Sequence, residues 1–89
     1  MRAVVTVVGL DRVGIIAETC TLLAGKNINI IDIRQTVMEG IFTMTMLVDA
    51  SNANDTFENV RQTLHELGER TKLSVHIQRE DTFTAMYQI

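Results

Sequence analysis

The residues best suited to binding chemistry lie in a bend near the start of the chain that is bracketed by Gly9 and Gly14. Between the glycines stand Leu10, Asp11, Arg12 and Val13. The bend follows a β-branched run and precedes a helical pattern, so N–H groups at the helix start can hold a carboxylate. Asp11 in the same bend can attract an ammonium group. The bend therefore offers one partner for each end of a free amino acid.

The same bend has two other interpretations, a nucleotide site and a purely structural turn. The glycine spacing matches a phosphate-binding P-loop, but Ile15 and Ile16 stand where Lys and Ser or Thr must follow. A nucleotide site is therefore excluded. In the structural interpretation Asp11 caps the helix and the glycines let the chain turn sharply. Spacing alone leaves this alternative open.

The remaining polar side chains of the sequence do not combine into a catalytic or metal site. His65 and His76 lie on different predicted elements without Cys, Asp or Glu at a ligand-like spacing, so we expect both to be exposed and predict no metal site. No Ser, His and Asp set and no carboxylate pair falls on one site. We therefore predict no catalytic residue, no cofactor and a protein that is not an enzyme.

The composition narrows the choice of partners. The chain has 89 residues, of which 46% are hydrophobic, and a net charge of -3 from 8 basic and 11 acidic residues. This balance lacks the basic stripe that nucleic-acid binding requires. With no secretory leader and no apolar stretch of ~20 residues, we expect a cytoplasmic protein without a membrane partner. The high apolar content of so small a chain leaves apolar surface exposed, so we expect an oligomer.

Apolar periodicity predicts one domain over residues 1–89, with a core of residues 1–80 and a tail of residues 81–89. Strands are predicted at residues 3–8, 27–37, 41–48 and 73–78, helices at about residues 14–24 and 55–70, and a short helix in the tail. The order β-α-β-β-α-β is that of the ferredoxin-like α+β fold. Its sheet has four antiparallel strands with both helices on one face.

Local signals add detail to this plan. In the first helix, Ile16, Cys20 and Leu23 form the predicted apolar face, which Ile15 and Leu22 widen. In the third strand, the residues predicted to face the core are Phe42, Met44, Met46 and Val48. Asp55 and Glu58 resemble a capping box at the start of the second helix. The adjacent Ile30 and Ile31 interrupt the alternation of the second strand and allow a β-bulge there.

Two segments resemble the signature of the ACT domain, a ligand-binding module of many enzymes and regulators of amino-acid metabolism. They are Val-Val-Gly-Leu-Asp-Arg-Val-Gly-Ile-Ile-Ala at residues 7–17 and Asn-Ile-Asn-Ile at residues 27–30. The entire chain, including residues 32–37 and 83–89, is similar to a family of small stand-alone bacterial and archaeal ACT proteins. It also resembles the ACT segments of glycine-cleavage regulators and formyltetrahydrofolate deformylases.

The resemblance implies paired domains whose sheets join side by side, with a ligand site where the first loop of one chain meets the second strand of its neighbour. Carried over by position, the loop side comprises Leu10, Asp11, Arg12, Val13 and Gly14, and the strand side is Asn29. The loop has Asp-Arg-Val where serine-binding members of the family have an Asn-Arg-Pro-like sequence. The Asn29 amide can both donate and accept hydrogen bonds across such an interface.

Two hypotheses for function follow. The first is a homodimeric sensor that binds a small amino acid or a related metabolite at the interface and regulates a partner protein not yet known. The second is a ligand-free interaction module, in which Phe83, Met86 and Tyr87 of the tail dock on a partner or on the other subunit. Binding of a small molecule to the purified protein would distinguish them.

Overall fold

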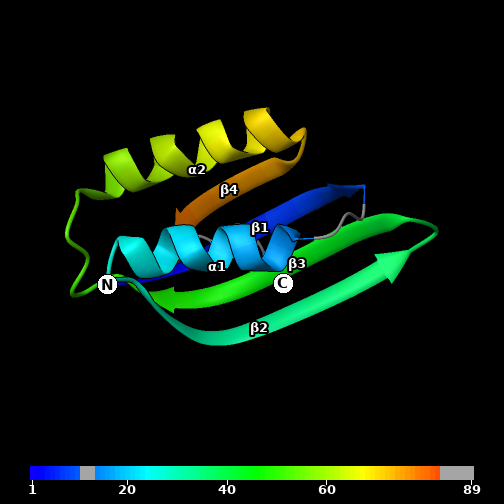
Figure 1. Ribbon diagram of the computed structural model, residues 1–89. Helices are drawn as coiled ribbons and strands as arrows, with labels where there is room; N and C mark the ends of the chain where they lie inside the picture. The colour runs from blue at the N-terminus through cyan, green and yellow to red at the C-terminus, as the bar shows by residue number, and fades with distance from the viewer. Residues whose placement is uncertain (11–13, 83–89) are drawn as a thin grey trace.

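A computed structural model describes residues 1–10 and 14–82 of the chain (Figure 1). Its elements are β1 Arg2–Leu10, α1 Ile15–Gly25, β2 Asn29–Met38, β3 Ile41–Asp49, α2 Phe57–Thr71 and β4 Ser74–Arg79. Residues 80–82 have helical backbone, while the rest of the predicted tail helix, with Phe83, Met86 and Tyr87, lies outside the described residues. The predicted β-α-β-β-α-β order is confirmed.

The four strands form one antiparallel sheet in the order β2-β3-β1-β4. Both helices lie on the same face of this sheet (Figure 1). The first strand is central, as its apolar run predicts, and Ala3, Val5 and Val7 are fully buried beneath the helices. β2 and β4 are the edges of the sheet. The ferredoxin-like prediction is therefore confirmed.

The core lies between the helices and the sheet. As predicted, the alternating face of β3 is buried, because Phe42, Met44, Met46 and Val48 all point to the helices. The other buried apolar side chains that complete this core include Ile15, Leu23, Ile28, Val60, Leu64, Val75 and Ile77. This layer joins α1 and α2 to β1, β3 and β4.

The buried face of α1 agrees with the prediction only in part, at Ile15 and Leu23. Ile15, Thr19 and Leu23 point to the core, whereas Ile16 is exposed and Cys20 is only partly buried. Apolar side chains occur around most of this helix, so periodicity did not select a face. The Thr19 hydroxyl donates to the Ile15 carbonyl oxygen at 2.9 Å, which satisfies its polar group inside the core.

The capping box predicted for α2 is wrong by one residue. Thr56 is the N-cap, because its backbone is extended and its hydroxyl oxygen accepts the Asn59 N–H at 3.1 Å. Glu58 instead pairs with Arg61 on the outer side of the helix. Asp55, one residue earlier, is left to contact α1.

The β2–β3 hairpin closes through a two-residue turn. Glu39 and Gly40 have φ angles of 49° and 82°, the left-handed pair that suits the twist of an antiparallel hairpin. The predicted bulge is confirmed, because the register steps from Ile30 to Asp32 and leaves Ile31 as the extra residue.

Two glycines near the ends of the helices provide a test of this packing. A Cβ at Gly68 would lie 2.6 Å from the Leu73 carbonyl oxygen, whereas Gly25 has open space around it. We expect Gly68→Ala to lower the free energy of unfolding by about 1–3 kcal/mol through overpacking. The control Gly25→Ala should raise it by up to ~1 kcal/mol, because alanine favours helices. Urea unfolding measures both changes, and a fully stable Gly68→Ala protein would contradict the close α2–β4 contact.

Candidate functional site

The loop half of the predicted site lies where β1 gives way to α1. Leu10 ends β1 and its side chain is 75% exposed. Gly14 is the N-cap of α1 with a φ of 90°, a left-handed conformation that favours glycine. Asp11, Arg12 and Val13 lie outside the described residues. The structure thus places Leu10 and Gly14 at the two ends of the bend.

The two glycines of the bend have different roles. Gly14 turns the chain at the start of α1 and, having no side chain, makes no side-chain cap bond to the first-turn N–H groups. Gly9, however, lies inside β1 opposite Phe42, so the expectation that it produces a sharp turn is wrong. Its missing side chain makes room for Leu73, which a Cβ at this position would contact.

The strand half of the predicted site lies in a polar hollow of about 410 Å³. Asn29 is the first residue of β2 and is exposed. The residues that line the hollow are Ala24, Asn27, Ile28, Asn29, Asp49 and Asn52. The Asn27 side chain, held in a left-handed backbone conformation, donates to the Asn52 carbonyl oxygen at 2.8 Å. Amide groups and one carboxylate therefore surround Asn29.

Sequence reasoning missed Asp49, which the sheet register places directly opposite Asn29. Its carboxylate accepts from the Ser51 hydroxyl at 2.6 Å and from the Ser51 N–H at 2.9 Å. These hydrogen bonds lower the pKa of Asp49, and the nearby N-terminal ammonium lowers it further. Asp49 is therefore an anion that stands beside the Asn29 amide. Only the β2–β3 register, which pairs Asp49 with Asn29, could have identified Asp49 as a site residue.

The connector between α1 and β2 is held by contacts with the segment before α2. Lys26 forms an ion pair with Asp55 at 2.8 Å. The Asn54 side chain donates to the Gly25 carbonyl oxygen at 3.1 Å, and the Asn54 N–H donates to the Lys26 carbonyl oxygen at 3.0 Å. These bonds hold the end of α1 and thereby the start of β2, where Asn29 lies.

The two halves of the site lie at opposite ends of the sheet. Leu10 pairs with Ile41, while Asn29 pairs with Asp49, which in turn pairs with Arg2. The eight residue steps from Arg2 to Leu10 correspond to about 27 Å at ~3.4 Å per residue. One chain therefore does not bring Leu10 and Gly14 together with Asn29. A single site that contains both halves requires a second copy of the chain.

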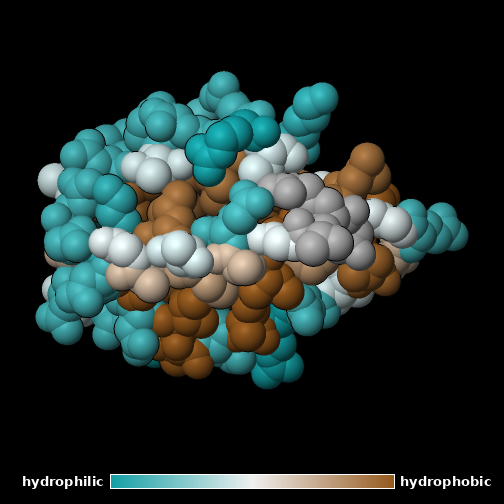
Figure 2. Space-filling view, viewed as in Figure 1, coloured by the Kyte–Doolittle hydropathy of each residue, from teal (hydrophilic) through white to brown (hydrophobic). Residues whose placement is uncertain are grey.

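The free edge of β2 is a surface to which a second copy could bind. Nine of its ten residues are exposed, and they include Ile31, Ile33 and Val37. Figure 2 shows apolar side chains gathered along the lower margin of the molecule, where β2 runs in Figure 1. A long apolar edge strand exposes unpaired backbone groups together with hydrophobic surface. It is therefore a template for pairing with another strand.

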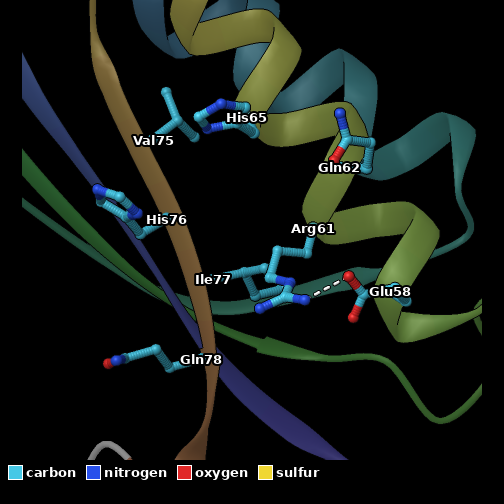
Figure 3. Close-up of a pocket in the computed structure, with 8 residues that line it drawn as sticks. All are labelled: Glu58, Arg61, Gln62, His65, Val75, His76, Ile77 and Gln78. Carbon is cyan, nitrogen blue, oxygen red and sulfur yellow. Dashed lines mark hydrogen bonds and ion pairs between the residues drawn. The ribbon is translucent and has the colours of Figure 1, made fainter.

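A second hollow, of about 610 Å³, lies between α2 and the edge of β4 (Figure 3). Arg61 of its lining pairs with Glu58, which raises the pKa of Arg61. The imidazole of His76 bonds to the Ser74 hydroxyl at 2.8 Å. Both His65 and His76 are exposed, as predicted. This hollow contains none of the predicted site residues, and its charged groups are already paired with one another.

Comparison with known proteins shows the family to which the chain belongs. Residues 2–78 match the family described as the ACT domain. The chain belongs to this family. A UPF0237 protein of Listeria innocua is 47% identical over 89 residues, which are all of both chains. The recognition of the ACT domain and of its small stand-alone members is therefore confirmed.

Solved structures show the same ACT fold. An ACT domain protein from Streptococcus pneumoniae has a TM-score of 0.80 and 32% identity, with coverage of 100% of this chain and 96% of that one. A protein assigned as a glycine cleavage system transcriptional repressor has a TM-score of 0.76 and 35% identity, with coverage of 86% and 44%. A formyltetrahydrofolate deformylase from Pseudomonas syringae, at 23% identity, shares the fold alone, with a TM-score of 0.79.

Two further findings concern residues 1–10 and 14–82. None of their helices is long and apolar enough to cross a membrane. Nor do their His, Cys, Asp and Glu side chains gather in groups of three or more that could hold a metal ion.

The ion pair that holds the connector predicts a response to acid. Hydrogen bonds from Lys26, Asn59 and the Thr56 N–H lower the pKa of Asp55 from 3.8 to about 2. Because this pKa is lowered on folding, the stabilisation is present above pH 3.8 and is lost as the pH falls towards 2. We expect Asp55→Asn to be less stable at neutral pH and to differ little from the parent near pH 2.

Urea unfolding at several pH values between 2 and 7 measures this effect, since the slope of stability against pH between 2 and 3.8 should be smaller in Asp55→Asn. Glu66→Gln, which removes an exposed carboxylate from α2, is the matched control. A slope in Asp55→Asn equal to that of the parent would show that the Lys26–Asp55 pair does not stabilise the fold.

Proposed function

We propose that this ACT domain protein is a regulatory sensor that acts as a homodimer and binds a small amino acid or a related acid at the subunit interface. The site would consist of Leu10, Asp11, Arg12, Val13 and Gly14 of one chain and Asn29 of the other. The observation that carries the proposal is the separation of these two halves along the sheet of one chain. Each copy supplies half of two sites, which is the arrangement that a two-fold axis produces.

Antiparallel pairing of two β2 strands supports this assembly. It sets the Asn29 end of one β2 against the Met38 end of the other. Met38 pairs with Ile41, and Ile41 pairs with Leu10, so the Met38 end of the sheet is the end at which the bend lies. Pairing through β2 therefore brings Asn29 of each chain towards the bend of its neighbour and also covers the apolar edge.

The chemistry of the two halves is complementary to an amino acid. The N–H groups at the start of α1 would donate hydrogen bonds to the carboxylate of the ligand. The Asn29 amide oxygen and the Asp49 carboxylate opposite it would take the ammonium group together with Asp11, since an ammonium has three N–H donors. A ligand held in this way contacts both chains, so its binding would stabilise the dimer.

The output of such a sensor passes through a partner protein. A ligand changes a regulatory interaction only when it binds one of two states more tightly than the other. Here the two states are the separated and the paired chains, or two arrangements of the pair. The similarity to a protein assigned as a transcriptional repressor supports a regulatory role for this kind of segment.

A thermal-shift screen against the twenty amino acids and common organic acids tests the proposal. A ligand at ~100 times its Kd adds about 2.7 kcal/mol of stability, which raises the Tm of a small domain by several degrees. No shift with any compound, from a protein that is dimeric by mass measurement, would favour the ligand-free interaction module.

A complementation experiment tests whether the site is shared between chains. Asp11→Ala and Asn29→Ala should each weaken binding by about 1–3 kcal/mol, because each removes a polar contact with the ligand. In a dimer that contains one copy of each variant, one site loses both groups and the other keeps both. After unfolding and refolding together, an equal mixture should therefore recover about one quarter of the tight sites, since half of the dimers are mixed.

Titration of the ligand identified in the screen, followed by calorimetry, measures the number of tight sites. Gln62→Ala, an exposed change on α2, is the control that should leave binding unchanged. A mixture that binds no better than the two separate variants would contradict a site formed by Asp11 of one chain and Asn29 of the other.

A further inference from the structure

Two opposite charges lie close together in the middle of the β2 edge. Asp32 pairs with Leu47 and Arg34 with Thr45, so both point to the sheet face that the helices leave free. Ile33 between them pairs with Met46 and points to the helix side. The Arg34 Nε lies 3.6 Å from the Asp32 Oδ2. The Asp32 side chain is 55% exposed and the Arg34 side chain is 84% exposed. Two charges so exposed gain little from each other within one chain.

A hydrogen bond shows which backbone groups face the open edge. The Ile33 N–H donates to the Asp32 carboxylate at 2.8 Å. An N–H that bonds to β3 points towards β3. Because the Ile33 N–H bonds instead to the side chain of Asp32, it points away from β3, along the free edge of β2. Asp32 therefore covers an edge donor with its carboxylate, which is one way in which proteins protect an edge strand.

Charge restricts how a second β2 can pair with this edge. In an antiparallel pair with the helices of both copies on the same side, opposite residues share a face and one residue lies opposite itself. If that residue is Asp32, two carboxylates face each other, and if it is Arg34, two guanidinium groups do. If it is Ile33, Asp32 of each chain faces Arg34 of the other. Like charges directly opposite are destabilising, and opposite charges are stabilising. Of these three registers, only the one centred on Ile33 avoids facing like charges and also pairs opposite charges.

We propose that two copies of the chain pair antiparallel through β2 with Ile33 on the two-fold axis, in a register selected by two reciprocal Asp32–Arg34 ion pairs. The proposal rests on the homodimer of the proposed function and adds its register. On pairing, the Ile33 N–H of each chain turns from Asp32 to the Ile33 carbonyl oxygen of the other chain. The released Asp32 carboxylate then meets Arg34 across the interface.

Charge reversal tests the proposed pairs. Asp32→Arg places an introduced arginine opposite Arg34, and Arg34→Asp places an introduced aspartate opposite Asp32. Each variant should self-associate at least about tenfold more weakly than the parent, because two attractive pairs become repulsive. The double variant D32R/R34D and an equal mixture of the single variants should both recover association, since each restores two opposite-charge pairs. Sedimentation velocity over a range of concentrations measures these affinities.

A cysteine scan measures the register directly. In a Cys20→Ser background, single cysteines replace Asp32, Ile33 or Arg34. Only the residue on the two-fold axis lies opposite itself, at a Cα separation of about 5.5 Å, which a disulfide can span. We expect Ile33→Cys alone to form a covalent dimer under mild oxidation, as seen on a non-reducing gel. The Cys20→Ser parent is the control and should stay uncrosslinked.

The outcomes separate this proposal from the one on which it rests. Crosslinking at residue 32 or 34 in place of 33, or a dimer that Asp32→Arg does not weaken, would overturn the register and leave the homodimer intact. A parent chain that is monomeric at all concentrations, with and without ligand, would overturn both. A covalent Ile33→Cys dimer together with charge-reversal rescue would establish the register.

Discussion

The pairing of β1 with β3 determines which face of the sheet is buried and at which end the bend lies. β1 pairs along its whole length with β3, from Arg2 opposite Asp49 to Leu10 opposite Ile41. Because side chains alternate along a strand, this pairing buries one face of β3 under the helices and sends the other face outward. It also places the bend after Leu10 and the start of β2 at opposite ends of the sheet. A single site that contained both halves would therefore need a second copy.

The helices stabilise the two ends of the sheet in different ways. At one end Gly14 begins α1 in a left-handed conformation and makes no side-chain cap bond. At the other end the ion pair between Lys26 and Asp55 joins the end of α1 to the residues that precede α2. The first arrangement places the start of α1 at the bend, and the second holds the backbone that carries Asn29.

Much of the fold could be predicted from the sequence because its patterns are long and regular. The alternation of β3, the bulge at Ile31 and the order of elements all follow from apolar spacing. The face of α1 could not be predicted, since Ile15 and Ile16 are equally apolar and the polar Thr19 proved to be buried through a bond to its own helix. Likewise, Asp55 and Thr56 are both good N-cap residues, and only the backbone conformation decides between them.

The candidate site was predictable only in part, because it depends on contacts between segments far apart in the chain. Gly14 and Asn29 could be named from local sequence and resemblance, but their separation depends on the pairing of strands far apart in the chain. Asp49 was missed because nothing in its own neighbourhood marks it. It belongs to the hollow around Asn29 only through the β2–β3 register and the hydrogen bonds from Ser51. Contacts between distant segments are what local patterns do not contain.

In the proposed dimer the two faces of β2 would have different roles. Ile33 and Val37 on the helix side are exposed, and burying them would supply most of the free energy of pairing, which depends on area and little on direction. Such surface alone would accept several registers. Asp32 and Arg34 on the other face add little net stability, because exposed ion pairs are weak, but like charges penalise the neighbouring registers. The apolar face would thus provide affinity, and the charged face would select one register among the antiparallel alignments that bring each Asn29 towards the opposite bend.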